Sequence, residues 1–415
     1  MRKSLTILLA LIIGILVSKA QTPPSTTGAV PRAETIKPTP PEVYFKRGIE
    51  IVAPDSLFSL NLRFRMQSRA LYFSESLTDF SMSEAEARVR RLRLRMEGFM
   101  YNPKLSYLIQ LSFSRGDMDW NVRDNSAINN SPNIIRDACV FYRPDNHWTF
   151  IFGQTKLPGN RQRVISSGDQ QFIDRSIVNA TYNIDRDFGL QAQYLNSIGN
   201  LFYIAKGALT TGDGRNVETT DKGLAYTGRL ELLPLGKFKN MGDYFEGDLE
   251  REETPKISIA GGLSYNEGAR RTGGQIGRDL YQQRNMTTYI YDALLKYRGF
   301  ALYLEHLDRR ADDPITMNEI GQIRHITTGT GSLAQASYLF KNNYEVAARY
   351  AMIRPSEAIA NLTPESDIAT AGVTKYIIRH KVKLQANISY QSRSQIAPIS
   401  PLQNWGAGFQ IELGI

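Results

Sequence analysis

The sequence predicts an all-β fold, a transmembrane antiparallel up-and-down β-barrel of about 16 strands, and two observations lead to this prediction. The first is an alternation of apolar and polar residues in 59–67, 91–97 and 409–415. Successive side chains of a strand point to opposite faces, so in 91–97 one face is apolar and the other holds three arginines about 7 Å apart. The second is that such segments recur between turns along most of the chain, which is typical of a membrane barrel with a polar interior.

Candidate strands and their connections follow a regular order. Short turns such as Asn102-Pro103 and Arg298-Gly299 alternate with long polar connections such as 156–185 and 310–330. Bacterial outer-membrane barrels have short periplasmic turns, long external loops and an even number of strands. One connection, 235–255, is longer and more acidic than the periplasmic turn expected at its place. The candidate strands lie near 58–72, 87–101, 104–115, 134–143, 147–155, 186–197, 200–210, 223–234, 256–267, 287–298, 300–309, 331–341, 343–353, 368–379, 381–391 and 404–415.

The N-terminal residues have the features of an export signal. A positive start precedes the apolar run Leu5–Val17, and small residues flank the expected cleavage position. The run is too short for a spanning helix, which needs about 20 residues. The sequence therefore predicts a signal peptide at 1–20, a Pro-rich periplasmic leader at 21–45, a barrel domain at 46–415, and location in the bacterial outer membrane.

The chain is basic, with 34 arginines, 16 lysines and a formal net charge of +9. A basic excess often indicates nucleic acid, but this chain is expected to be exported and has no visible nucleic-acid-binding motif. We therefore expect small anions, outer-membrane lipid and lipopolysaccharide as partners, and no nucleic acid. Arginine suits phosphate and carboxylate because its planar guanidinium donates two parallel hydrogen bonds.

Arginines at inward positions of the expected barrel are the candidate pore-lining residues. Guanidinium groups spaced by two residues lie within one Debye length, about 8 Å, so their fields add. Rings of arginine favour anions over cations. The alternative is that inward acids such as Glu97 and Asp137 neutralise the arginines and stiffen the wall. The candidates are Arg63, Arg65, Arg91, Arg93, Arg95, Arg229 and Arg349.

Several short motifs occur in a distinctive order. Gly153–Pro158, Ser166-Ser167 and Phe172–Ser176 follow one another around the connection 156–185, and Gly48–Glu50 lies ahead of the first strand. In this order they resemble the phosphate-selective porin O/P family, and the resemblance extends thinly over roughly 45–415.

The resemblance implies an outer-membrane barrel that assembles as a homotrimer and forms a passive, anion-preferring channel, with phosphate as the candidate solute. It also implies that the third external loop, 156–185, folds inward and narrows the pore. Alternatively, Asp174-Arg175-Ser176 acts as a structural clamp that fixes this loop to the wall. The candidate constriction residues are Arg161, Arg163, Ser166, Ser167 and Arg175.

No catalytic, metal or cofactor site is predicted. None of the four histidines lies at metal-ligand spacing from another histidine or cysteine. No Gly-x-Ser-x-Gly elbow or phosphate-binding loop occurs. Two alternatives to a channel stay open, an outer-membrane barrel enzyme that acts on lipid and a plugged barrel with a structural or adhesive role.

Overall fold

The computed structural model describes residues 42–45, 48–55, 57–114, 134–217, 223–396 and 402–415. The chain divides into two units, 1–40 and 41–415, and every described residue belongs to the second. The expected signal peptide and most of the expected leader therefore lie outside the described residues. Within those residues, no helix is long and apolar enough to cross a membrane.

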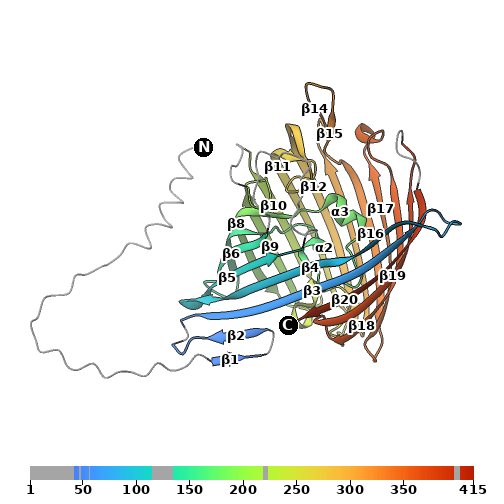
Figure 1. The fold of residues 1–415 in the computed structure, drawn as a ribbon. Helices are drawn as coiled ribbons and strands as arrows, with labels where there is room; N and C mark the ends of the chain where they lie inside the picture. Colours follow the sequence, from blue (N-terminus) through green and yellow to red (C-terminus); the bar gives the residue numbers. More distant parts are fainter. Residues whose placement is uncertain (1–41, 46–47, 56, 115–133, 218–222, 397–401) are drawn as a thin grey trace, which may run out of the picture. The chain divides into compact units, whose positions relative to one another are not determined.

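The second unit is a closed antiparallel β-barrel, as the sequence predicted (Figure 1). Its 18-stranded sheet consists of two short N-terminal strands and sixteen described strands that form the ring, in which β20 pairs with β3. The ring strands are β3 (Ser59–Ser74), β4 (Met82–Met100), β5 (Asn102–Ser112), β6 (Ile135–Tyr142), β7 (Trp148–Lys156), β8 (Arg186–Ile198), β9 (Leu201–Thr210), β10 (Ala225–Leu233), β11 (Lys256–Arg271), β12 (Asp279–Tyr297), β13 (Phe300–Arg310), β16 (Gly329–Leu339), β17 (Tyr344–Pro355), β18 (Ser366–Ile378), β19 (Val382–Arg393) and β20 (Leu402–Gly414).

The alternation of residue types sets which face of each strand points inward. On β3 and β4, Phe64 pairs with Leu94 on the outer face, whereas Arg65 pairs with Arg93 on the inner face. Phe64 is 40% exposed and Arg93 only 7%, because the outer face has no protein cover in this chain and the inner face does. The register shifts by one residue at Arg90, so Arg69 and Arg88 also pair on the inner face.

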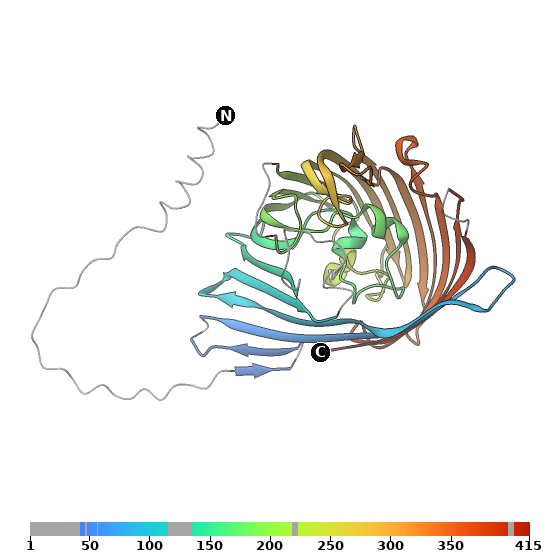
Figure 2. The same ribbon diagram turned by 45° about the horizontal axis from the view of Figure 1, so that its top comes forward.

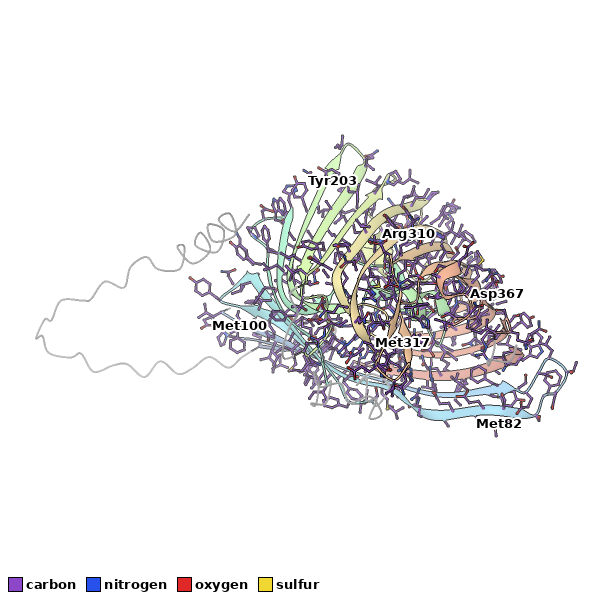
Figure 3. All side chains as sticks on the ribbon, turned by 90° about the horizontal axis from the view of Figure 1, so that it is seen from above. Met82, Met100, Tyr203, Arg310, Met317 and Asp367 are labelled. Carbon is purple, nitrogen blue, oxygen red and sulfur yellow. The ribbon has the colours of Figure 1, made fainter. Side chains whose placement is uncertain are left out.

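Some connections differ from those expected. The link 268–286 is mostly strand, because β11 and β12 extend into a tall hairpin. The link 310–330 contains a small hairpin of β14 (Ile315–Met317) and β15 (Ile323–His325). β4 begins at Met82, near the tip of the β3–β4 hairpin (Figure 3), and within the described residues its pairing with β5 starts at Arg93.

A short hairpin precedes the barrel. β1 (Glu42–Tyr44) pairs with β2 (Ile49–Val52), and β2 pairs with the first residues of β3. β20 ends its pairing at Arg65, so β2 occupies the edge of β3 that β20 leaves open. Three residues assigned from sequence to the leader are therefore part of the sheet.

One side of the barrel interior is a packed apolar core. Inward residues of β10, β12, β13, β16 and β17 meet side chains of the connection between β7 and β8, which contains the short helices α2 (Arg161–Val164) and α3 (Ile177–Tyr182). Figure 2 shows this connection, in green, within the ring of strands. The core residues are Leu157, Val178, Tyr182, Ile184, Leu233, Phe238, Ile290, Leu294, Tyr303, Leu307, Leu333, Ala351 and Ile353.

The contact between α3 and β16 leads to a prediction about Gly331. A Cβ atom on Gly331 would lie 2.8 Å from Tyr182 and 2.9 Å from Val178. Gly331→Val should therefore destabilise the barrel by about 1–3 kcal/mol through overpacking. Gly228→Val is the control, because a Cβ there meets no atom within 4 Å. Thermal unfolding in detergent measures both, and equal midpoints for the two variants would contradict the packing of α3 against β16.

Candidate functional site

Inward arginines of β3 and β4 meet a serine pair of the β7–β8 connection. Arg65 donates from Nη2 to Ser167 Oγ at 2.7 Å and from Nη1 to Ser166 Oγ at 3.2 Å. Arg93 donates from Nη1 to the same Ser167 hydroxyl at 3.0 Å. The structure thus brings two predicted wall residues together with two predicted loop residues, although 74 to 102 positions separate the bonded pairs along the chain.

The other β3 and β4 arginines have partly acidic surroundings. Arg95 donates to Glu97 at 2.6 and 2.9 Å, and Arg63 also pairs with Glu97. Arg91 donates to Gln67 at 2.8 Å and lies 3.5 Å from Asp174. Part of the wall charge is therefore neutralised, as the alternative reading of these arginines expected.

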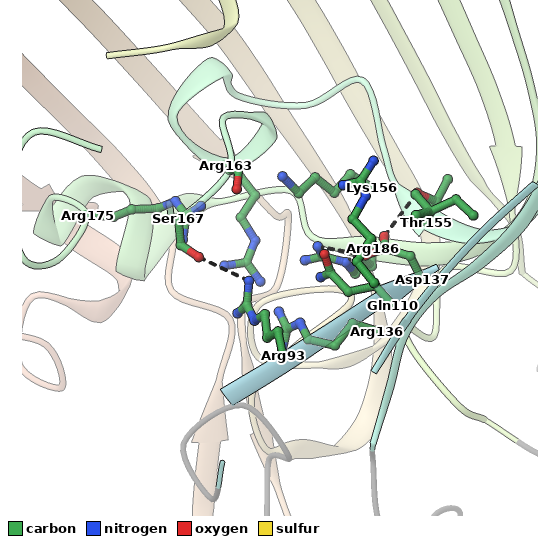
Figure 4. Close-up of a pocket in the computed structure, with 13 residues that line it drawn as sticks. Arg93, Gln110, Arg136, Asp137, Thr155, Lys156, Arg163, Ser167, Arg175 and Arg186 are labelled. Carbon is green, nitrogen blue, oxygen red and sulfur yellow. Dashed lines mark hydrogen bonds and ion pairs between the residues drawn. The ribbon is translucent and has the colours of Figure 1, made fainter. Parts of the chain in front are cut away.

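A small cavity between this wall and the connection is strongly basic (Figure 4). Its volume is about 100 Å³, and seven cationic side chains line it against one carboxylate, Asp137. Asp137 is already paired with Arg186, which donates to it at 2.9 and 3.1 Å. The lining also has hydroxyl and amide groups from Ser166, Ser167 and Gln110. The cations are Arg93, Arg95, Arg136, Lys156, Arg163, Arg175 and Arg186.

Three of these cations were not among the sequence candidates. Arg136 and Arg186 lie near the external ends of β6 and β8, where sequence alone locates strand ends only to within a few residues. Lys156 ends β7 directly before the connection, and its Nζ donates to Val164 O at 2.5 Å. These three side chains come near the serine pair only because β6, β7 and β8 pair with one another. No local sequence pattern could therefore have identified them.

Arg161 does not line the cavity. Its side chain is fully buried and donates to Asp292 at 2.6 Å, Ser258 at 2.8 Å and the carbonyl oxygen of Asp243 at 2.9 Å. These partners lie on β12, β11 and the connection between β10 and β11. Arg161 therefore anchors the β7–β8 connection to the far wall.

Arg175 lines the cavity and also holds the connection together. It donates to the carbonyl oxygens of Gln162 and Ile165, each at 2.7 Å. Ser176 begins α3, accepting a hydrogen bond from the Asn179 amide at 3.1 Å, and its own hydroxyl donates to Gln162 at 2.6 Å. Asp174 pairs with Arg69 and Arg91 on the wall. The Asp174–Ser176 stretch thus has the contacts expected of a clamp, while Arg175 also faces the cavity.

Arg229 and Arg349 lie away from the cavity. Arg229 pairs with Glu231 and Asp292, each at 2.6 Å, and is 5% exposed. The Arg349 guanidinium lies 4.5 Å from the Phe172 ring centre and donates to the Asp174 carbonyl oxygen at 3.1 Å. Arg349 thus contacts the connection directly, whereas Arg229 pairs with Asp292, the carboxylate that also binds Arg161.

The connection between β10 and β11 also reaches inward, which was not expected of a periplasmic turn. It contains the 3₁₀ segment η2 (Lys239–Tyr244), in which Asn240 and Met241 have positive φ and reverse the chain. Lys296 on β12 donates to the carbonyl oxygens of Gly242 and Phe245 at 2.6 and 2.8 Å. The segment is therefore held against the inner wall.

Glu246, two residues after η2, joins the connection between β10 and β11 to the β7–β8 connection. Its carboxylate accepts from the Gln171 amide at 2.9 Å, the Gln162 side chain at 3.3 Å and the Gln335 side chain at 3.2 Å. Its own amide donates to the Asp169 carbonyl oxygen at 3.0 Å. Gln162 and Gln171 bracket the serine pair, so the β10–β11 segment supports the loop that forms one side of the cavity.

Nearby charges shift the acids of the β7–β8 connection. Although burial opposes ionisation of the Asp174 carboxyl, Arg91, Arg69 and Arg90 hold its pKa below the usual value. Arg163 and Arg186 likewise overcome burial and hold the pKa of Asp185 well below its usual range. These carboxyl groups therefore stay ionised as loop anchors at neutral pH.

Comparison with known proteins agrees with this architecture. Residues 60–240 match the family described as phosphate-selective porin O and P. This is the family that the sequence motifs resemble, so the predicted resemblance is confirmed. A search of curated proteins found no match.

Solved porin structures share the fold. The outer-membrane channel DcaP of Acinetobacter baumannii has 11% identity and a TM-score of 0.53, with 89% of this chain and 100% of that chain covered. OmpF of Salmonella typhi has 11% identity and a TM-score of 0.52, covering 86% and 98%. OprB of Pseudomonas putida has 9% identity and a TM-score of 0.52, covering 86% and 94%. The barrel and the family match together support an outer-membrane porin channel.

Removing the Glu246 carboxylate should loosen the loop of this porin. Glu246→Ala leaves the buried partners Gln162, Gln171 and Gln335 short of an acceptor, which costs about 1–3 kcal/mol for each group left unsatisfied. We expect a lower thermal midpoint and noisier single-channel current. Glu253→Ala is the matched control, because Glu253 lies in the same connection between β10 and β11 and its side chain is 84% exposed. Identical current noise in the two variants would show that Glu246 does not steady the loop.

Acidification should release the Asp174 anchor. Because the folded-state pKa of Asp174 is lowered, its stabilising effect is present above the usual carboxyl pKa and is lost as the pH falls through the lowered value. Single-channel noise of the wild-type porin should therefore rise as the pH falls below about 4, the usual pKa of an aspartate. Asp174→Asn cannot ionise, so it should show a smaller rise; an unchanged rise would assign the effect to other acids.

Proposed function

We propose that this chain is a passive, anion-preferring porin whose solute path runs between the β7–β8 connection and the wall from β3 to β8. The observation that supports this proposal most strongly is that the seven cationic side chains of the cavity lining outnumber the three carboxylates paired with them, Asp137, Asp185 and Glu97. Arg163, Ser166, Ser167 and Arg175 are its constriction residues on the loop side. Arg93 and Arg95 are their counterparts on the wall.

The packed half of the interior confines the path. Apolar residues of β12, β13, β16 and β17 are covered by the connection and leave little room for a hydrated ion. Acids in that half, such as Glu231 and Asp292, are buried and paired with Arg229 or Arg161. A permeating ion therefore experiences mainly the charges of the β3–β8 wall.

The electrostatic attraction between the wall arginines and an anion is strong enough to select the anion and weak enough to release it. A unit charge 4 Å from one guanidinium gains roughly 4 kcal/mol at an effective dielectric constant near 20. This is enough to favour anions over cations, and neighbouring cationic sites compete for the same ion, which assists release. No energy source or cofactor enters this mechanism.

Phosphate is the proposed solute within the broader class of small anions. Guanidinium groups can donate paired hydrogen bonds to its oxygens, and the Ser166 and Ser167 hydroxyls lie beside Arg65 and Arg93. The family described as phosphate-selective matches the stretch that contains these residues. We further propose export through the signal peptide at 1–20, assembly as a homotrimer, and contact of the outer wall with membrane lipid and lipopolysaccharide.

Charge reversal at the wall tests the proposal. Arg93→Glu combined with Arg95→Glu should lower the chloride-to-potassium permeability ratio on the order of tenfold, because two nearby charges change sign. The measurement is the reversal potential in planar bilayers under a salt gradient. Phosphate added to the wild-type channel should also reduce the chloride current, and it should do so less effectively in the variant.

Arg310→Glu is the control for long-range charge effects. Arg310 is 67% exposed at the external end of β13 and is not part of the cavity lining. Its substitution should leave the permeability ratio close to that of the wild type. An unchanged ratio in the double variant, or an equal drop in the Arg310 variant, would remove the cavity from the selectivity mechanism.

A further inference from the structure

The outer wall of the barrel has an apolar hollow that extends from β13 to β20, with a volume of about 580 Å³. Three alanines form its floor. Ala336 pairs with Ala348, and Ala348 pairs with Ala371, so they lie in one row across β16, β17 and β18. Larger side chains continue this row at both ends, since Leu302 pairs with Ala336 and Ile388 pairs with Ala371. This outer hollow is therefore a depression between larger neighbours.

The strand register places the floor of the outer hollow outside the barrel. Gln335 and Arg349, each next to a floor alanine, are buried on the inner face. Successive side chains of a strand point to opposite faces, so the alanines face outward. Tyr350, Tyr390 and Trp405 wall the hollow toward the external end, with the Tyr390 and Trp405 ring centres 5.7 Å apart. A depression of this kind loses packing contacts unless another molecule fills it.

Small residues on a membrane-embedded surface favour contact with protein. Lipid chains are as apolar as side chains, so protein surfaces in a membrane associate mainly through close packing, which small residues permit. The hollow extends across six strands, from Leu302 on β13 to Trp405 on β20. At the usual strand spacing this is about 24 Å, close to the width of a standard contact that buries about 800 Å² on each partner.

Charge at the external rim of the hollow disfavours an anionic lipid as its occupant. The Tyr350 hydroxyl donates to Asp367 at 2.6 Å. Arg354 pairs with Asp367 at 2.9 Å and lies 3.6 Å from Glu365. This cluster contains two carboxylates and one guanidinium, so its net charge repels a phosphate headgroup at this place.

The β3–β4 hairpin projects from the barrel on the same side as the hollow. Figures 1 and 2 show its tip extending past the ring beside the strands β17–β19, and Figure 3 labels Met82 at this tip. Phe80 and Met82 are 66% and 62% exposed there. The Tyr72 hydroxyl holds the tip by donating to the Phe80 carbonyl oxygen. Exposed apolar groups of this kind mark an interaction surface.

A ridge of large apolar side chains lies three strands from the centre of the hollow. Phe64 on β3 and Phe409, Ile411 and Leu413 on β20 are each at least 38% exposed. The β20 residues between them are buried and face inward. In a ring of sixteen strands, a separation of three strands is about 67° around the barrel axis. This is close to the angle of about 60° between the two contact surfaces of each copy in a closed ring of three.

We propose that the outer hollow is the docking site of a second copy of this chain, which inserts its β3–β20 ridge, and that three such contacts close a trimer. The contact is heterologous, because it joins two different surfaces, and their angle allows the ring to close. The β3–β4 hairpin of the first copy then lies over the second. This inference rests on the homotrimer of the proposed function and gives that assembly its contact surfaces.

Filling the hollow tests the docking site. Ala348→Phe combined with Ala371→Phe places two rings on its floor and should cause loss of the trimer. The measurement is the mass of the full-length protein in detergent by light scattering. Ala192→Phe combined with Ala205→Phe is the matched control, because these alanines face outward on β8 and β9, away from both surfaces. The control should stay trimeric like the wild type.

Unchanged conductance of single barrels in potassium chloride verifies that the filled variant and its control are folded. A filled variant that stays trimeric would overturn the proposal. If that variant instead loses lipid that co-purifies with the wild type, the hollow belongs to lipid.

Cysteine pairs test which surfaces meet. Ala371→Cys combined in turn with Phe409→Cys, Ile411→Cys or Leu413→Cys should give covalent trimers on mild oxidation for at least one pair. Cys139→Ser removes the native cysteine from the background. Ala371→Cys alone should give no covalent product, because two hollows do not meet. Covalent dimers from Ala371→Cys alone, or no covalent trimer from any pair, would overturn the ridge-in-hollow contact.

The outcome is separable from that of the proposed function. A trimer that ignores both sets of variants would leave the homotrimer standing and remove these contact surfaces. A monomeric wild type would remove the homotrimer and this inference with it. Neither result changes the anion selectivity of a single barrel, which the reversal potential measures independently.

Discussion

Two arginines that face each other across one strand pair, and share one serine hydroxyl, determine the character of this barrel. Arg65 and Arg93 are directly paired on the inner face of β3 and β4, and both donate to Ser167 Oγ. Like charges directly opposite each other on a sheet are destabilising, and Glu412, 3.7 Å from Arg65, offsets only part of this repulsion. The strand register fixes both side chains on the inner face of the closed barrel. They cannot turn to the outer face, because that face meets hydrocarbon. The remaining positive potential is therefore available to an anion.

The interior of the barrel is divided between two tasks. On one side, buried ion pairs such as Arg161–Asp292 and an apolar core hold the β7–β8 connection in place. Glu246 adds support from the β10–β11 segment, so two connections from different parts of the ring meet inside it. On the other side, the wall from β3 to β8 keeps an excess of cations around a small cavity. A loop that is fixed on one side can hold a narrow, well-defined passage on the other.

The sequence was sufficient for the barrel and for its basic inner face, because both follow from alternation with a period of two residues. Motif resemblance also predicted Arg163, Ser166, Ser167 and Arg175 as constriction residues, and these four side chains line the cavity. The sequence could not distinguish these residues from Arg161. Arg161 and Arg163 flank the same glutamine and have the same local pattern, and only the fold shows that Arg161 pairs with Asp292. The inward reach of 235–255 was also missed, since its partner Lys296 and its contact with Gln171 are far away in the chain. Contacts across the interior of a barrel leave no periodic trace in the sequence.

The location of a bound anion tests the basic cavity most directly. Crystals of the full-length protein soaked in bromide or rubidium salts would locate each ion by its anomalous scattering. The proposed mechanism predicts a bromide peak among Arg93, Lys156, Arg163 and Ser167 and no rubidium peak there. A rubidium peak in the cavity, or bromide bound only elsewhere in the interior, would contradict it.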